Sequence, residues 1–313
     1  MIKYLFGIYR SSPFWLRRII GTCTRPLQLA MQPFRTIRLG GYSMRLDFGD
    51  NASFKYFSDR ENYEKAELNA FIGCVIRNPA ALVIDIGANY GAYTLAAANL
   101  SRYGVASTIL AIEPDPRPCA ALRASAKLNH FDKYVRVFPN IVSDHNGDET
   151  LYINARSSAD NRTGVVTTAP ISIHATRRVQ ARTVDQILEE SSVDKRKQFI
   201  IKMDIQGNEP RALAGMKELI AQCDGFILFF EHCRYLIDSA QCSYNDYLMH
   251  LAALEGDEFY RIEKGTLRKL PGRAGSGFQL LLKEFEELDR QVETKMQGSG
   301  GNFVIVRGLT MWA

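Results

Sequence analysis

Two acidic residues and two glycines in the first third of the chain could together bind a ligand of the nucleotide kind. Asp85 lies in an apolar run at residues 82–86, which suits a strand buried on both faces. Gly87 and Gly91 follow in the segment D-I-G-A-N-Y-G, where a missing Cβ lets a ligand approach the backbone. Glu113 ends the next apolar run, and a carboxylate there can accept hydrogen bonds from both hydroxyls of a ribose.

The spacing of these residues discriminates between nucleotide cofactors. A nicotinamide or flavin fingerprint needs G-x-G-x-x-G after the strand, whereas this turn is D-x-G-A-x-x-G. No G-K-[ST] follows, so a P-loop is also excluded. A ligand with adenosine at one end, an amino acid at the other and no phosphate fits, with Asp85 holding the amino-acid portion. S-adenosylmethionine is such a molecule. The alternative for Glu113 is a solvent-facing carboxylate without a ligand.

A second group of reactive residues lies in the segment K-M-D-I-Q-G-N-E, residues 202–209. Lys202 and Asp204 share one face of a predicted strand because side chains alternate along it. Glu209 falls in the first turn of the following helix, where the helix dipole alone favours a carboxylate. A hydroxyl that accepts a methyl group needs a base. Asp204 and Glu209 are therefore candidate catalytic residues, with helix capping and ion pairing as the alternatives.

Glu231 and His232 end the next predicted strand. His232 has an ordinary pKa near neutrality and could be a general base beside Asp204. A dedicated metal site is not expected, but Asp204, Glu231 and His232 could instead hold one divalent ion such as Mg²⁺. The more ordinary alternative for His232 is a hydrogen-bonded pair or a packed strand edge.

The elements that position these residues alternate between strand and helix, which predicts a mostly parallel sheet with helices on both faces. The predicted strands are residues 82–86, 108–113, 134–138, 199–204, 226–231, 259–262 and 302–308. The last two are expected to be antiparallel neighbours. Two hairpins are also predicted, at residues 42–58 and 141–153, together with a helix at 61–76.

The basic charge is concentrated at the N-terminus. The chain has 313 residues and a net charge of +5, yet residues 1–46 contain eight Lys or Arg and no acid. This segment is also rich in apolar residues, so it either packs on the catalytic domain as short helices or contacts an anionic membrane through residues 1–40. No apolar stretch approaches the roughly 20 residues that span a bilayer.

Composition also restricts the compartment and the partners. The six cysteines form no C-x-x-C pair or disulfide-like framework, which indicates a reducing compartment. We expect a cytoplasmic protein, with the inner membrane surface as a peripheral alternative. No basic and aromatic stripe recurs beyond the N-terminal segment, so no nucleic-acid partner is expected.

Several separated segments, in order, make the chain resemble the FkbM-type S-adenosylmethionine-dependent methyltransferases over about residues 80–262. These segments are VIDIGANYGAYT (83–94), AIEPDP (111–116), NIVSDHNGDETLYI (140–153), RTVDQIL (182–188), IIKMDIQGNEPRALAGM (200–216) and ILFFEH (227–232). The resemblance implies a class I methyltransferase fold of the Rossmann-like kind. Its sheet would have seven mostly parallel strands, the last one antiparallel, with the cofactor across their carboxyl ends.

The resemblance also implies positions for the cofactor. It places the methionine end and the turn against Asp85, Gly87, Asn89 and Gly91, the ribose on Glu113, and the adenine near Ser143 and Asp144. Two positions depart from the family pattern. Ile141 stands where a small residue is common, and Gln206 replaces a common acid before Gly207.

These observations predict a methyltransferase that methylates a hydroxyl group. The resemblance implies a sugar or glycan precursor as acceptor. The alternatives are a lipid or polyketide acceptor at a membrane, or a non-catalytic module that binds an adenosyl ligand. Arginines in the polar segment after residue 153 could bind an anionic acceptor, or could simply be solvated: Arg156, Arg162, Arg177 and Arg178. We expect residues 79–313 to form the catalytic domain and residues 1–78 an N-terminal extension.

Overall fold

A computed structural model of the chain was analysed. It describes residues 34–58, 64–105, 108–164, 173–195, 197–263, 266–271, 277–295 and 300–311. The expected short helices or membrane contact of residues 1–33 therefore lie outside the described residues. Within the described ranges, no helix combines the length and apolar character required to cross a bilayer.

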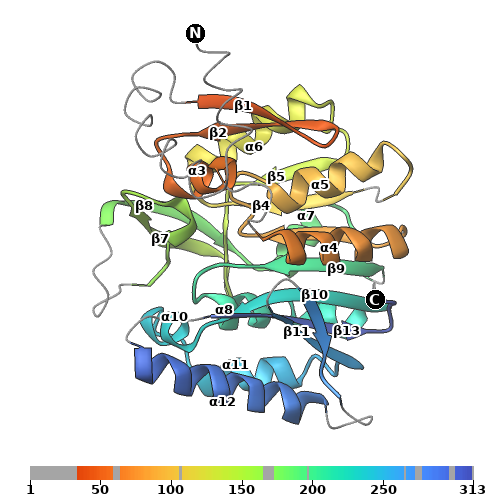
Figure 1. Cartoon of the computed structure of the whole chain (residues 1–313), viewed down its shortest axis with the longest axis vertical. Helices are drawn as coiled ribbons and strands as arrows, with labels where there is room; N and C mark the ends of the chain where they lie inside the picture. Colours follow the sequence, from red (N-terminus) through yellow and green to blue (C-terminus); the bar gives the residue numbers. More distant parts are fainter. Residues whose placement is uncertain are drawn as a thin grey trace.

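The molecule is built on an eight-stranded central sheet (Figure 1), in the order β12-β11-β13-β10-β9-β3-β4-β5. From the last strand named to the first, the bounds are β5 (Val135–Phe138), β4 (Ile109–Ile112), β3 (Leu82–Ile86), β9 (Gln198–Met203), β10 (Gly225–His232), β13 (Gly301–Arg307), β11 (Glu258–Glu263) and β12 (Thr266–Lys269). The five strands from β5 to β10 are parallel, and β13 is antiparallel to both β10 and β11.

This arrangement confirms the mixed α/β fold with a large, mostly parallel sheet, and it confirms β11 and β13 as antiparallel neighbours. The sheet has one strand more than the seven expected, because β12 pairs with β11 at the edge. The sequence TLRK of β12 is short and mostly exposed, so it carries no apolar pattern that would reveal a strand.

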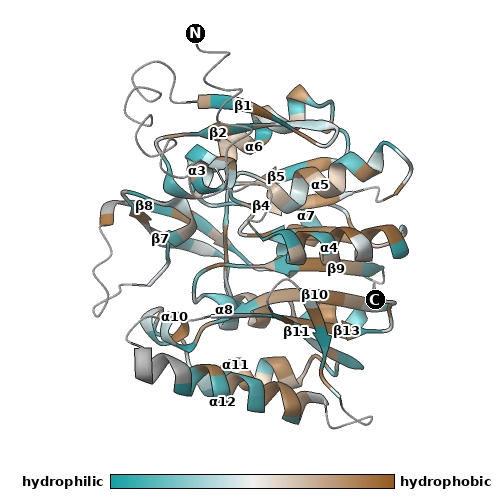
Figure 2. Ribbon diagram, in the orientation of Figure 1, coloured by the Kyte–Doolittle hydropathy of each residue, from teal (hydrophilic) through white to brown (hydrophobic). Residues whose placement is uncertain are grey.

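Helices cover both faces of the sheet (Figure 1). One face carries α4 (Lys65–Arg77), α5 (Ala92–Ser101) and α6 (Pro116–Leu128). The other carries α7 (Val184–Glu190), α8 (Glu209–Ala214), α9 (Lys217–Gln222), α11 (Tyr244–Ala252) and α12 (Gly277–Lys295). A short helix, α10 (Arg234–Ser239), follows β10. Figure 2 shows the central strands as predominantly hydrophobic, which matches their burial on both faces.

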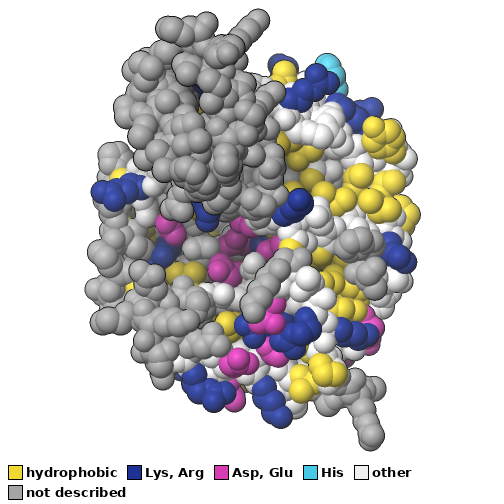
Figure 3. Space-filling model, in the orientation of Figure 1, with side chains coloured by type: hydrophobic (Ala, Val, Ile, Leu, Met, Phe, Trp, Pro, Cys, Tyr) yellow, Lys and Arg dark blue, Asp and Glu magenta, His cyan; other side chains and the backbone are white. Residues whose placement is uncertain are grey.

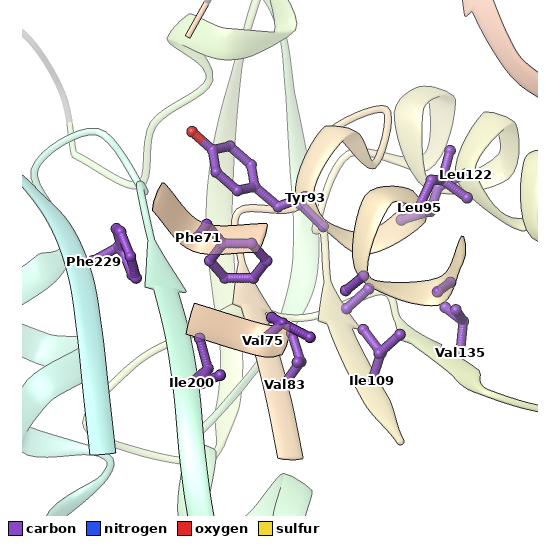
Figure 4. Packing of buried hydrophobic residues seen from close by; sticks show 14 of the residues in the cluster. Phe71, Val75, Val83, Tyr93, Leu95, Ile109, Leu122, Val135, Ile200 and Phe229 are labelled. Carbon is purple, nitrogen blue, oxygen red and sulfur yellow. The ribbon is translucent and has the colours of Figure 1, made fainter. Parts of the chain in front are cut away.

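Aromatic rings join α4 and α5 to the sheet. The Phe71 ring of α4 lies 5.2 Å from that of Tyr93 on α5 and 5.6 Å from that of Phe229 on β10, both in edge-on geometry. Val83 and Ile200 of the neighbouring strands belong to the same apolar cluster (Figure 4). This packing fixes the start of α5 over the carboxyl end of β3.

The predicted hairpin at residues 42–58 is wrong in its position along the chain. The hairpin is formed by β1 (Phe34–Leu39) and β2 (Tyr42–Asp47), joined by Gly40 and Gly41, which both have positive φ. A two-residue turn of this kind favours two glycines. Residues 51–58 are instead helix α3 (Asn51–Ser58), and the Asp50 carboxylate accepts the Ala52 N–H at 2.9 Å.

The predicted hairpin at residues 141–153 is also wrong. β6 (Ile141–Val142) and β7 (Gly147–Asn154) do not pair with each other; both pair with β8 (Ile173–Arg182), in a small three-stranded sheet. The interposed strand comes from later in the chain, so no local turn signal reveals it.

The N-terminal extension shares the core of the larger domain. Met44, Leu46 and Phe48 are buried in the same apolar cluster as α5 and β3. The backbone N–H of Ser43 donates to Asn129 at 2.7 Å, just after α6. The division between residues 78 and 79 stays a prediction.

Candidate active site

A crevice lies at the carboxyl ends of β3, β4 and β9. The space between its lining atoms, counted out to the open mouth, is about 1070 Å³. Its acidic and basic lining residues are Glu64, Asp85, Glu113, Asp204, Arg162 and Lys202. Acidic side chains gather near the centre of the face shown in Figure 3.

Asp85 is the acidic residue of the β3 end. Its side chain is buried and accepts hydrogen bonds from the backbone N–H of Thr94 at 3.0 Å and the Thr94 hydroxyl at 2.5 Å. Burial raises the pKa of Asp85 to about 6, against the opposing effects of Thr94 and Lys202. The carboxylate therefore holds the first turn of α5 against β3 while it lines the crevice.

Glu113 follows the end of β4 and is also buried. Its carboxylate accepts the backbone N–H of Asn89 at 2.8 Å and that of Asp115 at 2.7 Å. Burial raises the pKa of Glu113 to about 8, although both hydrogen bonds oppose the shift. Each oxygen keeps a second lone pair, so the residue lines the crevice with acceptor capacity left, as a ribose ligand would require.

We predict that Glu113→Ala weakens S-adenosylmethionine binding by about 1–3 kcal/mol, since a hydrogen-bond acceptor for the ribose is lost. Isothermal titration of the wild type and the variant measures the difference. An unchanged dissociation constant would refute the assignment of Glu113 to the ribose.

Gly87 and Gly91 shape the turn between β3 and α5. Both have positive φ, 82° and 90°, and Gly91 is the N-cap of α5. A Cβ on Gly87 would lie 2.0 Å from the backbone oxygen of Asp204. A Cβ on Gly91 would lie 2.3 Å from the Leu122 side chain. Gly87 therefore permits the close approach of the β3 and β9 turns, whereas the approach of a ligand to either glycine stays a prediction.

Gly87→Ala should destabilise the protein by about 1 kcal/mol for the positive φ and by about 1–3 kcal/mol more for the clash with the rigid backbone at Asp204. Gly104→Ala is the matched control, because Gly104 has φ +78° but nothing within 4 Å of an added Cβ. Urea unfolding of both variants separates the two effects. Equal losses would show that the contact with Asp204 is unimportant.

Asn89 connects the turn to a distant segment. It has φ +48°, its N–H donates to Glu113, and its side-chain oxygen accepts the Ser158 hydroxyl at 3.1 Å. Ser158 begins the short 3₁₀ helix η1 (Ser158–Asp160). Asn89 therefore lines the crevice and also anchors η1 across it.

Ser143 and Asp144 do not line the crevice, although the resemblance places them near the adenine. The Ser143 hydroxyl contacts the Asp144 carboxylate at 3.3 Å, and Asp144 pairs with His145 at 2.8 Å. The wall is formed instead by residues 140–142, just upstream. The segment was correctly identified, but the contacting positions are offset, because Ser143 and the residues after it turn away toward β7.

Asp204 and Lys202 lie at the end of β9, as their alternation predicts. The Lys202 ammonium is 3.1 Å from Glu67 of α4 and 3.7 Å from Asp204. Burial lowers the pKa of Lys202, but Glu67 and Asp204 outweigh it and raise the net value. The Asp204 side chain keeps 35% of its surface exposed and lines the crevice, so it can reach a bound ligand.

Glu209 builds the turn after β9 and is not in the crevice wall. Its carboxylate accepts the backbone N–H groups of Ile205 at 3.0 Å and Gly207 at 2.9 Å. Burial raises the pKa of Glu209 to about 7. Glu209 thus orders the turn before α8; this differs from the helix cap expected as the alternative to a catalytic role, because α8 has no side-chain cap hydrogen bond.

Gln206 bridges two acidic groups. Its amide nitrogen donates to Asp204 at 2.8 Å and to Glu231 at 3.3 Å. Burial, followed by the charge of Asp204, raises the pKa of Glu231 to about 8. An acid at position 206 would instead place three carboxyl groups together, so the departure from the family pattern supplies a hydrogen-bond donor here.

His232 does not join Asp204 and Glu231. Successive residues of β10 point to opposite faces, and His232 is packed with its ring 3.7 Å from that of Phe285 on α12. Its Nε2 lies 3.4 Å from Asp289. The prediction that His232 is a base beside Asp204, or a metal ligand with Glu231, is therefore wrong in its geometry. In the described part of the chain, no three His, Cys, Asp or Glu residues are grouped to hold a metal ion.

The sequence did not reveal how η1 would close the crevice. Besides the contact with Asn89, the Ser158 N–H donates to the buried Asp50 carboxylate at 3.2 Å, and the Asn161 amide donates to Asp115 at 2.8 Å. These contacts join residues up to 108 positions apart. The only local signal was the run of polar residues, which by itself indicates a surface loop.

Comparisons with known proteins identify the family of the chain. The sequence model of the FkbM methyltransferase domain matches residues 85–260. Among solved structures, the fold is similar to the methyltransferase FkbM from Methylobacillus flagellatus (16% identity, 69% of this chain and 52% of that chain, TM-score 0.40). It is also similar to TYW2 from M. jannaschii in complex with AdoMet (11% identity, 88% and 84%, 0.38) and to a putative SAM-dependent methyltransferase from Streptococcus mutans (12%, 88% and 56%, 0.42).

The chain spans about half the length of the first of these structures. No curated protein matches the sequence. The domain match covers more than half of the chain and includes the β3 turn, the β4 end and the β9 turn. The chain therefore belongs to the FkbM family of S-adenosylmethionine-dependent methyltransferases.

Proposed function

We propose that this protein transfers the methyl group of S-adenosylmethionine to a hydroxyl group of a sugar or glycan precursor. The observation that supports this most directly is the convergence of Asp85, Glu113 and Asp204 on one crevice. Asp85 lies at the end of β3, Glu113 at the end of β4 and Asp204 at the end of β9, which are adjacent parallel strands. Ligands of open α/β sheets bind at such strand ends. The saccharide acceptor rests on the family resemblance.

The residues present fit the cofactor. Gly87 lines the crevice without a side chain, and a Cβ there would collide with the backbone oxygen of Asp204. The buried carboxyls of Asp85 and Glu113 offer acceptors for an amino group and for ribose hydroxyls. When bound, S-adenosylmethionine supplies a methyl group on a sulfonium, and an acceptor oxygen can attack the methyl carbon in line with the departing sulfur.

Asp204 is the residue placed to take the acceptor's proton. The Asp204 carboxylate would take the hydroxyl proton as the acceptor oxygen receives the methyl group and the cofactor is released as a neutral thioether. Lys202 and Gln206 hold this carboxylate from two sides, at 3.7 and 2.8 Å. Positioning of this kind fixes one orientation of the base without blocking its exposed edge.

Isothermal titration with S-adenosylmethionine, S-adenosylhomocysteine and NADH tests the proposal. We expect micromolar binding of the two adenosyl ligands and none of NADH. A screen of glycan and lipid acceptors with radiolabelled cofactor then identifies the hydroxyl. A folded protein that binds no adenosyl ligand would refute the proposed function. Binding without transfer to any acceptor would favour the non-catalytic alternative.

A further inference from the structure

Arg162 is a basic residue of the crevice wall that the proposed chemistry does not use. It follows η1 and is held by its backbone, since its N–H and C=O both exchange hydrogen bonds with Tyr152 of β7, at 3.1 and 2.8 Å. Two residues on, a Cβ at Gly164 would lie 2.4 Å from the Cα of Ala240, just after α10. The backbone around Arg162 is therefore fixed between β7 and α10.

The guanidinium of Arg162 is short of partners. Its Nε and Nη1 atoms are both inaccessible to solvent, and neither has a hydrogen-bond partner among the described residues. Leaving buried donors of a charged group unpaired is costly. Burial lowers the pKa of Arg162, while Asp160 opposes that shift. A ligand with matching acceptors would relieve this cost.

Arg162 lies where the crevice wall approaches β10. The strand ends follow the order β4, β3, β9, β10, which carry Glu113, Asp85, Asp204 and Glu231 in turn. Gly164, two residues after Arg162, lies against Ala240 just after α10, the helix that follows β10. Asp204, the proposed base, thus lies between the cofactor residues and the β10 end, where Arg162 is found.

We propose that Arg162 binds an oxyanion, a carboxylate or phosphate, carried by the methyl acceptor. This inference rests on the proposed function and narrows its acceptor to an anionic saccharide such as a uronic acid or a sugar phosphate. A guanidinium presents two parallel N–H groups that match such an anion. The acidic lining would orient the acceptor toward Arg162, because Lys202, the other basic residue named in the lining, is already paired with Glu67 and Asp204.

The first arm of the test asks whether the oxyanion belongs to the cofactor instead. S-adenosylhomocysteine carries a carboxylate, whereas 5′-methylthioadenosine lacks the amino-acid portion. We expect Arg162→Met to bind both ligands as the wild type does. A selective loss of S-adenosylhomocysteine affinity would place the oxyanion on the cofactor and overturn the assignment to the acceptor.

The second arm titrates the protein saturated with S-adenosylhomocysteine with matched probes: glucuronate against glucose, and glucose 6-phosphate against glucose. We expect the wild type to prefer the anionic member of at least one pair, and Arg162→Met to lose that preference by about tenfold to a hundredfold. Arg162→Lys should recover the preference for the anionic probe only in part, because lysine lacks the two parallel N–H groups of the guanidinium. Arg156→Met, an exposed arginine of the same segment, is the control.

No preference for charge in any pair, or an equal preference in Arg162→Met, would overturn the inference. Retained S-adenosylhomocysteine binding shows in the same samples that the variant is folded. It also separates failure of this inference from failure of the proposed function, which would abolish adenosyl binding in the wild type itself.

Discussion

Lys202→Met should destabilise the protein by about 3–5 kcal/mol, because it leaves Glu67 buried without its cation. The two side chains are each 4% exposed, and their charged atoms lie 3.1 Å apart. Glu67 comes from α4 and Lys202 from β9, so the pair joins a helix to the central sheet. Equilibrium unfolding in urea measures the loss.

Two comparisons test the cause of that loss. In the double variant Glu67→Gln with Lys202→Met, no isolated charge remains at position 67, so we expect much of the stability to return. Lys269→Met removes a lysine paired with Glu258 at the surface, where the lysine side chain is 56% exposed, and should cost at most about 1 kcal/mol. A loss no larger for Lys202→Met than for Lys269→Met would contradict the buried-pair account.

Asp204→Asn should lower turnover by about 10²–10⁴-fold, the usual contribution of a positioned general base. Asparagine keeps the size and one oxygen, so the hydrogen bond from Gln206 at 2.8 Å can persist. Affinity for S-adenosylhomocysteine should therefore change little. The measurements are methyl transfer to the acceptor found in the screen and titration with S-adenosylhomocysteine.

Asp144→Asn is the matched control for this substitution. Asp144 was also expected near the cofactor, but it pairs with His145 outside the crevice, so turnover should stay near the wild-type value. If Asp204→Asn reduced ligand affinity as much as turnover, Asp204 would be a binding residue and the base would have to be found elsewhere.

The cofactor turn was predictable from the sequence because its determinants are local. Asp85, Gly87 and Gly91 lie within seven residues of one another, and a buried strand followed by a glycine turn leaves few alternatives. Glu113 was predictable for a related reason, since parallel strands meet at one edge of the sheet. The family match over residues 85–260 confirms this part of the interpretation at the level of the family and its fold.

His232 shows why neighbours in sequence were misleading. Glu231 and His232 are adjacent in the chain, but the alternation of β10 sends Glu231 toward Gln206 and His232 toward Asp289 on the opposite face. The same period of two that correctly paired Lys202 with Asp204 should have separated these residues. Phe229 and Phe230, the preceding pair of β10, show the same alternation, because they belong to the two different apolar clusters.

The closure by η1 could not be derived in this way. Its contacts with Asp50, Asn89 and Asp115 depend on where three separate segments arrive in space. Each hydrogen-bonding residue is individually common in surface loops. Arg162 was recognised only as one of several arginines, because the lack of partners for its guanidinium is a property of the folded chain.

The attachment of η1 has a consequence for the order of events in a catalytic cycle. Asn89 and Asp115 each donate a backbone N–H to Glu113, and they accept side-chain hydrogen bonds from Ser158 of η1 and from Asn161 just after it, next to Arg162. A first ligand that immobilises Glu113 would thus also restrict Arg162 and lower the entropy cost of holding the second. The two substrates would bind with positive cooperativity, and by thermodynamic reciprocity each would raise the affinity for the other by the same factor.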